Sequence, residues 1–370
     1  MSGKIRLSKS SISTLEKEAV LKVLDKEFLG MGEEVQEFEQ NIKQYLQTDM
    51  EVVCVNTGTS ALHLSLLSLG LKEGDEVLVP SLTYIASFQA ISATGANPIA
   101  CDIKEDTLFI DIDDAKKRVT KNTKAIMPVH YASSSKGIEE VYKFAKEYNL
   151  RVVEDAAQSF GCKREKNFVG QYGDIICFSF DGIKNITSGE GGAILSHDKE
   201  FIQRVKDARL LGVEKDTDKR YAKQRSWDFD VKYQGFRYHM SNIMASIGIV
   251  QLSRIEEFKI KRQQIVNNYI NNLSMLKEIQ ILDFNFHEML SHIFVIKVKN
   301  RDNLREYLLS NNIECGIHYK PNHLLTKYNI KYNLSVTEKI YREILTLPCH
   351  YNLTNLEQDY VISKVKEFYE

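Results

Sequence analysis

The stretch IICFSFDGIKNITSGEGGAILS, residues 175–196, contains two apolar runs joined by a segment that holds one lysine and ends in a glycine-rich turn. The runs 175–180 and 192–196 are short and rich in β-branched and aromatic residues, which is typical of strands. Because no segment of helical length separates them, we expect an antiparallel pair here. Lys184 lies between the two runs, although lysine is rarely fully buried. Either its ammonium reaches water, or its amine is held in place for chemistry.

Upstream of this stretch, short apolar runs alternate with helical patterns. The runs span residues 52–55, 76–80, 98–103, 125–130 and 151–156. This alternation indicates a mostly parallel sheet with helices on both faces. Residues 14–46 predict two amphipathic helices that precede the first run.

The pattern changes near residue 250, where a long charged helix leads to HIFVIKV, a further helix, ECGIHY and a last helix. We therefore predict two α/β domains. Residues 1–250 form a large domain with a mostly parallel seven-stranded sheet flanked by helices, and residues 251–370 form a small one. No low-complexity linker separates them, so we expect them to pack closely.

Composition excludes several classes of protein. The 370 residues include 49 basic and 50 acidic ones, a formal charge of -1, which disfavours a nucleic-acid binder or a polybasic membrane protein. No apolar run is long enough for a bilayer, and the first residues lack the apolar core of a signal peptide, so we expect a cytoplasmic protein. The six cysteines and nine histidines are dispersed without metal-ligand spacing. We expect buried free thiols and no metal.

Polar residues follow several of the expected strands, and ligands of doubly wound sheets bind outside the carboxyl ends of strands. Asp155 ends one strand, and Gln158 follows one turn later. Tyr84 comes just after another strand, and Ser179 lies in the strand that leads to Lys184.

A phosphate cradle is predicted at TGTS, residues 57–60, between the first strand and a helix. Free amides at a helix start, with a glycine and hydroxyls, favour an anion. With Lys184 and Asp155, this set suits pyridoxal phosphate (PLP). Its aldehyde needs a lysine for a Schiff base, and its ring nitrogen needs a carboxylate to stay protonated. Each feature alone has an ordinary explanation, such as a helix cap or a tight hairpin, and only their combination favours the cofactor.

The sequence resembles the PLP-dependent nucleotide-sugar aminotransferases (the DegT/StrS family), which share the aspartate aminotransferase fold (PLP fold type I). The resemblance covers nearly the whole chain and rests on NTGTSALHLSL, PSLTYIAS, VEDAAQSFG, FSFDGIKNITSGEGG and GIHYKPNHLL. It implies that Lys184 forms the Schiff base and moves the proton, and that Asp155 pairs with the ring nitrogen. Gln158 would bind the ring hydroxyl oxygen, and Tyr84 would stack on the ring. The phosphate would be held by Gly58, Thr59, Ser60 and Ser179.

The resemblance departs from the family at GFRYHM, residues 235–240, where the usual Asn is Arg237 and the usual Arg is His239. In the family this segment reaches the active site of the partner chain, so a homodimer with active sites at the interface is implied. We expect Arg237 to bind the phosphate. His318 and His323 are candidate substrate contacts. Roles for Glu190 and His239 stay open.

The resemblance implies an aminotransferase that moves an amino group from L-glutamate to a nucleotide-linked keto-sugar. Our prediction is C4 of a 4-keto-6-deoxy sugar, for amino sugars of surface polysaccharides such as the O-antigen of lipopolysaccharide. A branch of the family with His in place of Lys dehydrates sugars, and Lys184 argues against that branch. Alternatives are amination at C3 of a 3-keto sugar, amination of a keto-cyclitol, and a non-catalytic PLP-binding regulator. The nucleotide is left open.

Overall fold

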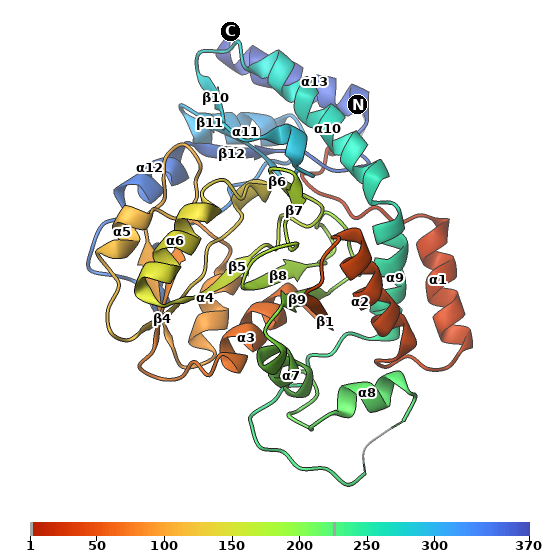
Figure 1. Cartoon of the computed structure of the whole chain (residues 1–370). Helices are drawn as coiled ribbons and strands as arrows, with labels where there is room; N and C mark the ends of the chain where they lie inside the picture. Colours follow the sequence, from red (N-terminus) through yellow and green to blue (C-terminus); the bar gives the residue numbers. More distant parts are fainter. Residues whose placement is uncertain (1–2, 225–226) are drawn as a thin grey trace.

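The computed structural model describes residues 3–224 and 227–370 (Figure 1). Its centre is a seven-stranded sheet of order β1-β9-β8-β5-β4-β2-β3. The strands are β1 (Glu51–Val55), β2 (Glu76–Pro80), β3 (Asn97–Cys101), β4 (Thr123–Ile126), β5 (Arg151–Asp155), β8 (Ile175–Ser179) and β9 (Gly192–Ser196). All neighbours pair in parallel except β9, which is antiparallel to both β8 and β1. The mostly parallel seven-stranded sheet and the antiparallel pair are thus confirmed.

Both faces of the sheet are covered, so both sets of alternating side chains are apolar. On one face lie α2 (Glu33–Tyr45), α5 (Ile112–Lys116) and α6 (Ile138–Tyr148). On the other lie α3 (Gly58–Ser68), α4 (Ile85–Ser92) and α7 (Lys199–Ala208). Along β8, Ile176 and Phe178 contribute to the first core, whereas Ile175 and Cys177 contribute to the second.

The two predicted N-terminal helices are α1 (Thr14–Asp25) and α2, and α9 (Asn242–Ser253) packs against both. Ser13 and Glu16 form a capping box at the start of α1. The Ser13 side chain accepts from a backbone amide of the first turn, and the Glu16 side chain accepts from the backbone amide of Ser13. Short elements connect the rest: β6 (Lys163–Arg164), β7 (Asn167–Phe168), α8 (Asp216–Tyr221) and the 3-10 turns Tyr131–Ser133, Phe286–Glu288, Asn322–Leu324 and Thr326–Tyr328. Figure 1 shows α8 on a segment that extends away from the central sheet.

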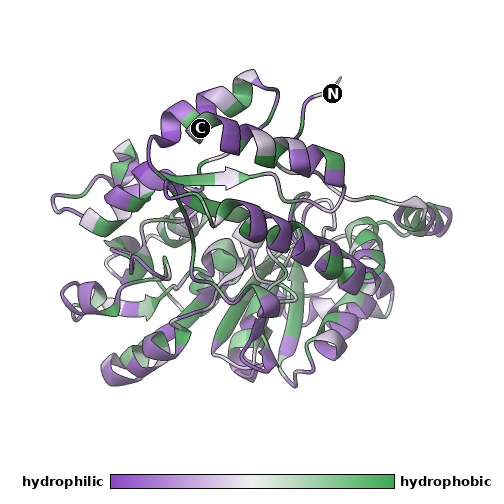
Figure 2. Cartoon of the chain, turned by 90° about the horizontal axis from the view of Figure 1, so that it is seen from above, coloured by the Kyte–Doolittle hydropathy of each residue, from purple (hydrophilic) through white to green (hydrophobic). Residues whose placement is uncertain are grey.

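A smaller antiparallel sheet of order β10-β11-β12 follows, made of β10 (Ile279–Ile281), β11 (Phe294–Val298) and β12 (Ile344–Leu347). Its helices are α10 (Ile255–Leu273), α11 (Arg301–Ser310), α12 (Ser335–Glu343) and α13 (Asn355–Tyr369). Figure 2 shows mainly hydrophobic strands surrounded by helices with hydrophilic stretches. The division at residue 250 remains a prediction. The N-terminal residues contact the part of the chain after residue 250, because Ile5 pairs with Ile313 in an isolated bridge.

The six cysteines are buried with free thiols, as predicted. Within the described ranges, no helix combines the length and the apolar character that a bilayer crossing requires.

Candidate active site

Lys184 lies in the turn between β8 and β9. Its amide donates to the Asp181 carbonyl (3.0 Å), and the Ser188 amide donates to the Phe180 carbonyl (2.9 Å), which closes the turn. The Lys184 side chain is half-buried, and within residues 3–224 and 227–370 its amine has no hydrogen-bond or ion-pair partner. Burial lowers the pKa of this amine, an effect that Asp155 and Asp181 partly oppose. The lysine is therefore held as an unpaired amine instead of being extended into solvent.

Asp155 ends β5 beside β8 and is only 6% exposed. Its Oδ2 accepts a hydrogen bond from Ser87 Oγ (2.7 Å), and its Oδ1 accepts one from the Ala157 amide (3.2 Å). Burial raises the pKa of Asp155, while the Ser87 and Ala157 hydrogen bonds and the charge of Lys184 oppose that rise. Two donors thus orient the carboxylate and leave it capacity to accept a further proton donor.

Gln158 and two tyrosines lie beside these residues. Gln158 Oε1 accepts from the Ala132 amide (2.8 Å), and its Nε2 donates to Tyr319 Oη (3.0 Å). Tyr84 immediately precedes α4 and is 57% exposed. Its ring centroid lies 5.6 Å from that of Tyr319, at an interplanar angle of 51°. The exposed Tyr84 ring therefore offers a free face to a flat ligand.

The predicted phosphate cradle is the first turn of α3. Thr57 caps the helix, and its Oγ1 accepts from the Ser60 amide (3.0 Å), so the amides of Gly58 and Thr59 are the ones left without an acceptor in the helix. The Ser60 hydroxyl donates to Asn56 Oδ1 (2.7 Å), so both donors of Ser60 are used inside the cap.

Gly58 permits the helix end to meet β8. A Cβ at this position would stand 2.7 Å from Ser179 Cβ and 2.9 Å from its Oγ. The glycine thus lets the start of α3 approach the buried Ser179 hydroxyl closely, and free amides beside a hydroxyl are donors suited to an anion.

These residues fit PLP. The unpaired amine of Lys184, the oriented carboxylate of Asp155 and the cradle at Gly58 match the aldehyde, the ring nitrogen and the phosphate of the cofactor. Within the described ranges no group of three or more His, Cys, Asp or Glu side chains is arranged for a metal ion.

Arg237 is not part of this cluster. It is exposed, pairs with Leu210 in an isolated bridge, and lines a separate cavity of about 150 Å³ with Arg220 and His239. Burial lowers the pKa of His239 to about 4, and the charges of Arg220 and Arg237 add to the effect. The same cavity is lined by Asp216, which pairs with Arg220 (2.6 Å), so within its own chain Arg237 lies in a separate cavity of mixed charge.

The two candidate substrate histidines have different surroundings. His318 is half-buried, its Nδ1 lies 2.8 Å from Thr346 Oγ1, and burial together with the charge of Lys184 lowers its pKa to about 4. His323 is buried, with Nδ1 2.7 Å from Ser81 Oγ and Nε2 3.5 Å from Glu338 Oε1. His318 thus lies within the electrostatic reach of Lys184, whereas both ring nitrogens of His323 face protein groups.

Sequence reasoning missed Ser87, Tyr319 and Asn185. Ser87 lies one turn after Tyr84 on α4, but its partner Asp155 is 68 residues away. Tyr319 follows His318 directly, and only the fold brings it to Gln158. No sequence signal links either pair.

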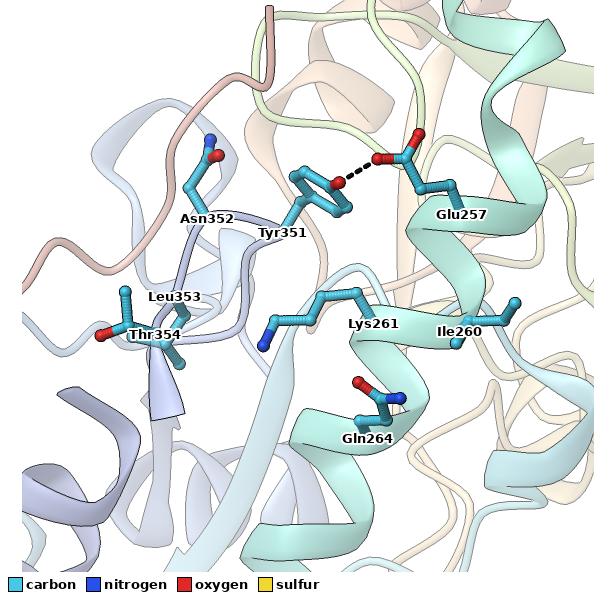
Figure 3. A pocket seen from close by; sticks show the side chains of 8 residues that line it. All are labelled: Glu257, Ile260, Lys261, Gln264, Tyr351, Asn352, Leu353 and Thr354. Carbon is cyan, nitrogen blue, oxygen red and sulfur yellow. Dashed lines mark hydrogen bonds between the residues drawn. The ribbon is translucent and has the colours of Figure 1, made fainter. Parts of the chain in front are cut away.

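A larger hollow of about 390 Å³ lies between α10 and the loop before α13 (Figure 3). Lys261 and Gln264 line it from α10, and Asn352 and Thr354 line it from the loop. On its rim the Tyr351 hydroxyl donates to Glu257 Oε1. Tyr351 also lines the narrow cleft that contains Lys184, so it borders both cavities.

Comparisons with known proteins agree with this geometry. The model of the DegT/DnrJ/EryC1/StrS aminotransferase family matches residues 10–366. The GDP-perosamine synthase of Escherichia coli O157:H7 is 36% identical over 369 residues, 97% of each chain. The structure of DesV from S. venezuelae has a TM-score of 0.87 at 30% identity, over 96% of this chain and 94% of that one. The PLP form of Spr1654 from Streptococcus pneumoniae has a TM-score of 0.89 at 28% identity, over 98% of each.

Proposed function

Because the chain belongs to the DegT/DnrJ/EryC1/StrS aminotransferase family, we propose that it transfers the amino group of L-glutamate to C4 of a 4-keto-6-deoxy sugar on a nucleoside diphosphate. It is a PLP-dependent sugar aminotransferase. The observation that carries the proposal is the unpaired, half-buried amine of Lys184 beside Asp155. A neutral amine can bind the aldehyde of PLP and can also take and return a proton, so a lowered pKa suits both roles that the proposal gives to Lys184.

Lys184 moves the proton in this proposal. When bound, PLP supplies a ring that accepts the electrons of a broken C–H bond. Because burial lowers the pKa of Lys184, part of the amine population is neutral and can take that proton and return it. Asp155 holds a proton on the ring nitrogen, since Ser87 and Ala157 fix its two oxygens.

The other residues bind and orient the cofactor. The amides of Gly58 and Thr59 and the hydroxyl of Ser179 hold the phosphate, and Ser60 shapes the turn through its cap bonds. Gln158, whose Nε2 keeps one hydrogen after its bond to Tyr319, would meet the ring hydroxyl oxygen, and the exposed face of Tyr84 would cover the ring.

The substrate proposal rests on the segment GFRYHM and on a relative. The relative at 36% identity is a GDP-perosamine synthase, which supports a nucleoside-diphosphate sugar, GDP-linked in the first instance. His318, uncharged above a pH of about 4, offers its Nε2 to a sugar hydroxyl without repelling the Lys184 ammonium. His323 holds its own loop through its contacts with Ser81 and Glu338, so the proposal gives the sugar contact to His318.

We also propose a homodimer with active sites at the interface. Arg237 is exposed and lies outside its own Lys184 cluster, which leaves its guanidinium available to the phosphate of a partner chain. Exposed apolar side chains such as Leu21 (57% exposed) on α1 and Trp227 (87% exposed) are of the kind that an interface between two chains would cover. The reaction would take place in the cytoplasm and supply amino sugars for surface polysaccharides such as the O-antigen.

An absorption experiment tests the proposal. PLP is added to purified wild type and to Lys184→Ala, and the band of lysine-bound cofactor is followed before and after addition of L-glutamate. We expect the band only in wild type and its loss with glutamate, after which a panel of GDP- and dTDP-linked keto-sugars and keto-cyclitols identifies the acceptor. Lys136→Ala is the control, because Lys136 is a surface lysine paired with Asp283. Equal turnover of glutamate by Lys184→Ala would sink the assignment, and a band that ignores glutamate would favour the regulator.

A further inference from the structure

We propose that Asn185 is a positioning residue for Lys184, because its buried side-chain amide ties the lysine turn to the turn of Gln158 and to Leu290 beside the smaller sheet. The proposal rests on the proposed function, in which Lys184 moves the proton. Asn185 would not touch substrate or cofactor, and it acts only through the backbone that carries the amine.

The contacts of Asn185 join segments that are far apart in the sequence. The side chain is only 4% exposed. Its Nδ2 donates to the carbonyls of Phe160 (2.8 Å) and Leu290 (2.9 Å), and lies 3.3 Å from the carbonyl of Gln158. An amide nitrogen has two hydrogens, so both are used and the third contact is shared. One side chain therefore links the lysine turn to two other segments.

Leu290 and the two residues that follow it are held by side chains from both predicted domains. Its carbonyl also accepts from Ser133 Oγ (3.2 Å), and its amide donates to Cys162 Sγ (3.3 Å). Arg262 of α10 donates to the carbonyls of the next two residues, both at 2.9 Å. Asn185 thus anchors the lysine turn to a segment that cannot easily shift.

This anchoring matters because the other hydrogen bonds of the turn, such as those of the Lys184 and Ser188 amides, close it on itself, whereas Asn185 ties it to Leu290. Lys184 lies outside any helix or strand, and its amine is at the end of a flexible four-carbon stem. Without the Asn185 contacts, the turn can move away from Leu290 and let water reach the stem. The burial that lowers the pKa of the amine would then decrease, and the amine would lose its fixed direction.

The test measures the amine separately from the activity. Apoprotein is acetylated with a limiting amount of acetic anhydride across a pH series, and mass spectrometry quantifies the labelled Lys184 peptide. Asn185→Leu keeps a side chain branched at Cγ and removes the donors. We expect its Lys184 pKa to move toward the ordinary value of 10.5, and its kcat for glutamate to fall by about tenfold with KM changed less than about twofold.

Asn268→Ala is the matched control. The side chain of Asn268 on α10 also donates a hydrogen bond to another helix, to Gln358 Oε1 of α13 (3.1 Å), but it is not part of the lysine turn. It should lower the melting temperature and leave the labelling profile unchanged. If Asn185→Leu does not fold, Asn185→Ala takes its place.

An Asn185 variant with a lower melting temperature but the wild-type labelling profile and kcat would overturn the proposal. If wild type fails to use glutamate while the profile still depends on Asn185, the proposed function is wrong and the positioning role stands.

Discussion

Ser87→Ala removes one of the two donors that orient Asp155. Ser87 Oγ lies 2.7 Å from Asp155 Oδ2 in a buried site, so the bond is a charge-assisted one. Such a bond contributes about 1.5–3 kcal/mol. If this difference appears fully in binding of the cofactor ring, the Kd for PLP rises by about tenfold to a hundredfold. The Ala157 contact remains, so the carboxylate is loosened and not removed.

The same substitution has a pH signature in the apoprotein. Burial already raises the pKa of Asp155 above its ordinary value of 3.8, so the folded state binds this proton more readily than the unfolded state does. The contribution of Asp155 to stability therefore falls as the pH rises from 3.8 through the folded pKa. Loss of the Ser87 donor raises the folded pKa further. Ser87→Ala should thus destabilise the apoprotein at pH 7, and this part of the loss should vanish in acid below 3.8.

The assay is a PLP titration followed by absorbance, combined with denaturant unfolding at several pH values. Ser92→Ala is the control on the same helix, because Ser92 Oγ donates to the Phe88 carbonyl (2.7 Å) and does not reach Asp155. Wild-type affinity for PLP in Ser87→Ala, with an unchanged pH dependence of stability, would refute the reasoning.

Three further outcomes are expected. Gly58→Ala places a Cβ 2.7 Å from that of Ser179 and must displace the helix end, so PLP affinity should fall by about tenfold or more in the same titration, and an unchanged Kd would contradict the cradle. His318→Gln should leave the pH profile of the glutamate half-reaction between pH 6 and 9 in place, because burial puts the pKa of His318 near 4, below that window. Mixing Arg237→Ala with Lys184→Ala chains should restore activity through hybrid dimers if Arg237 acts across the interface, and no recovery on mixing would place Arg237 outside the partner's site.

The architecture of the large sheet could be predicted because it depends on local pattern. Runs of apolar residues that alternate with helices fix which segments are buried, and a short connection between 175–180 and 192–196 leaves an antiparallel pair as the available arrangement. The ordered residues at strand ends, such as Asp155, follow from the same pattern, since the carboxyl ends of parallel strands meet at one edge.

The contacts that shape the site came only from the tertiary structure. Ser87 meets Asp155 across 68 residues, Gln158 meets Tyr319 across 161, and Asn185 meets Leu290 across 105. Hydrophobic periodicity reports which face of an element is buried, but it carries no information on which distant loop packs against it.

The sequence also carries no information on the surroundings of two predicted contact residues, His323 and Arg237. His323 has the residue type expected of a substrate contact, but the fold turns its ring toward Ser81 and Glu338. Arg237, for which a contact with the phosphate of a partner chain is predicted, lies outside the Lys184 cluster of its own chain, and that prediction depends on the assembly of two chains. The sequence by itself determined the strands, the order of the polar residues at the strand ends, and the lysine. Packing of segments remote in the chain decided which groups orient that lysine and its carboxylate, because each such hydrogen bond depends on the relative placement of two separately formed elements.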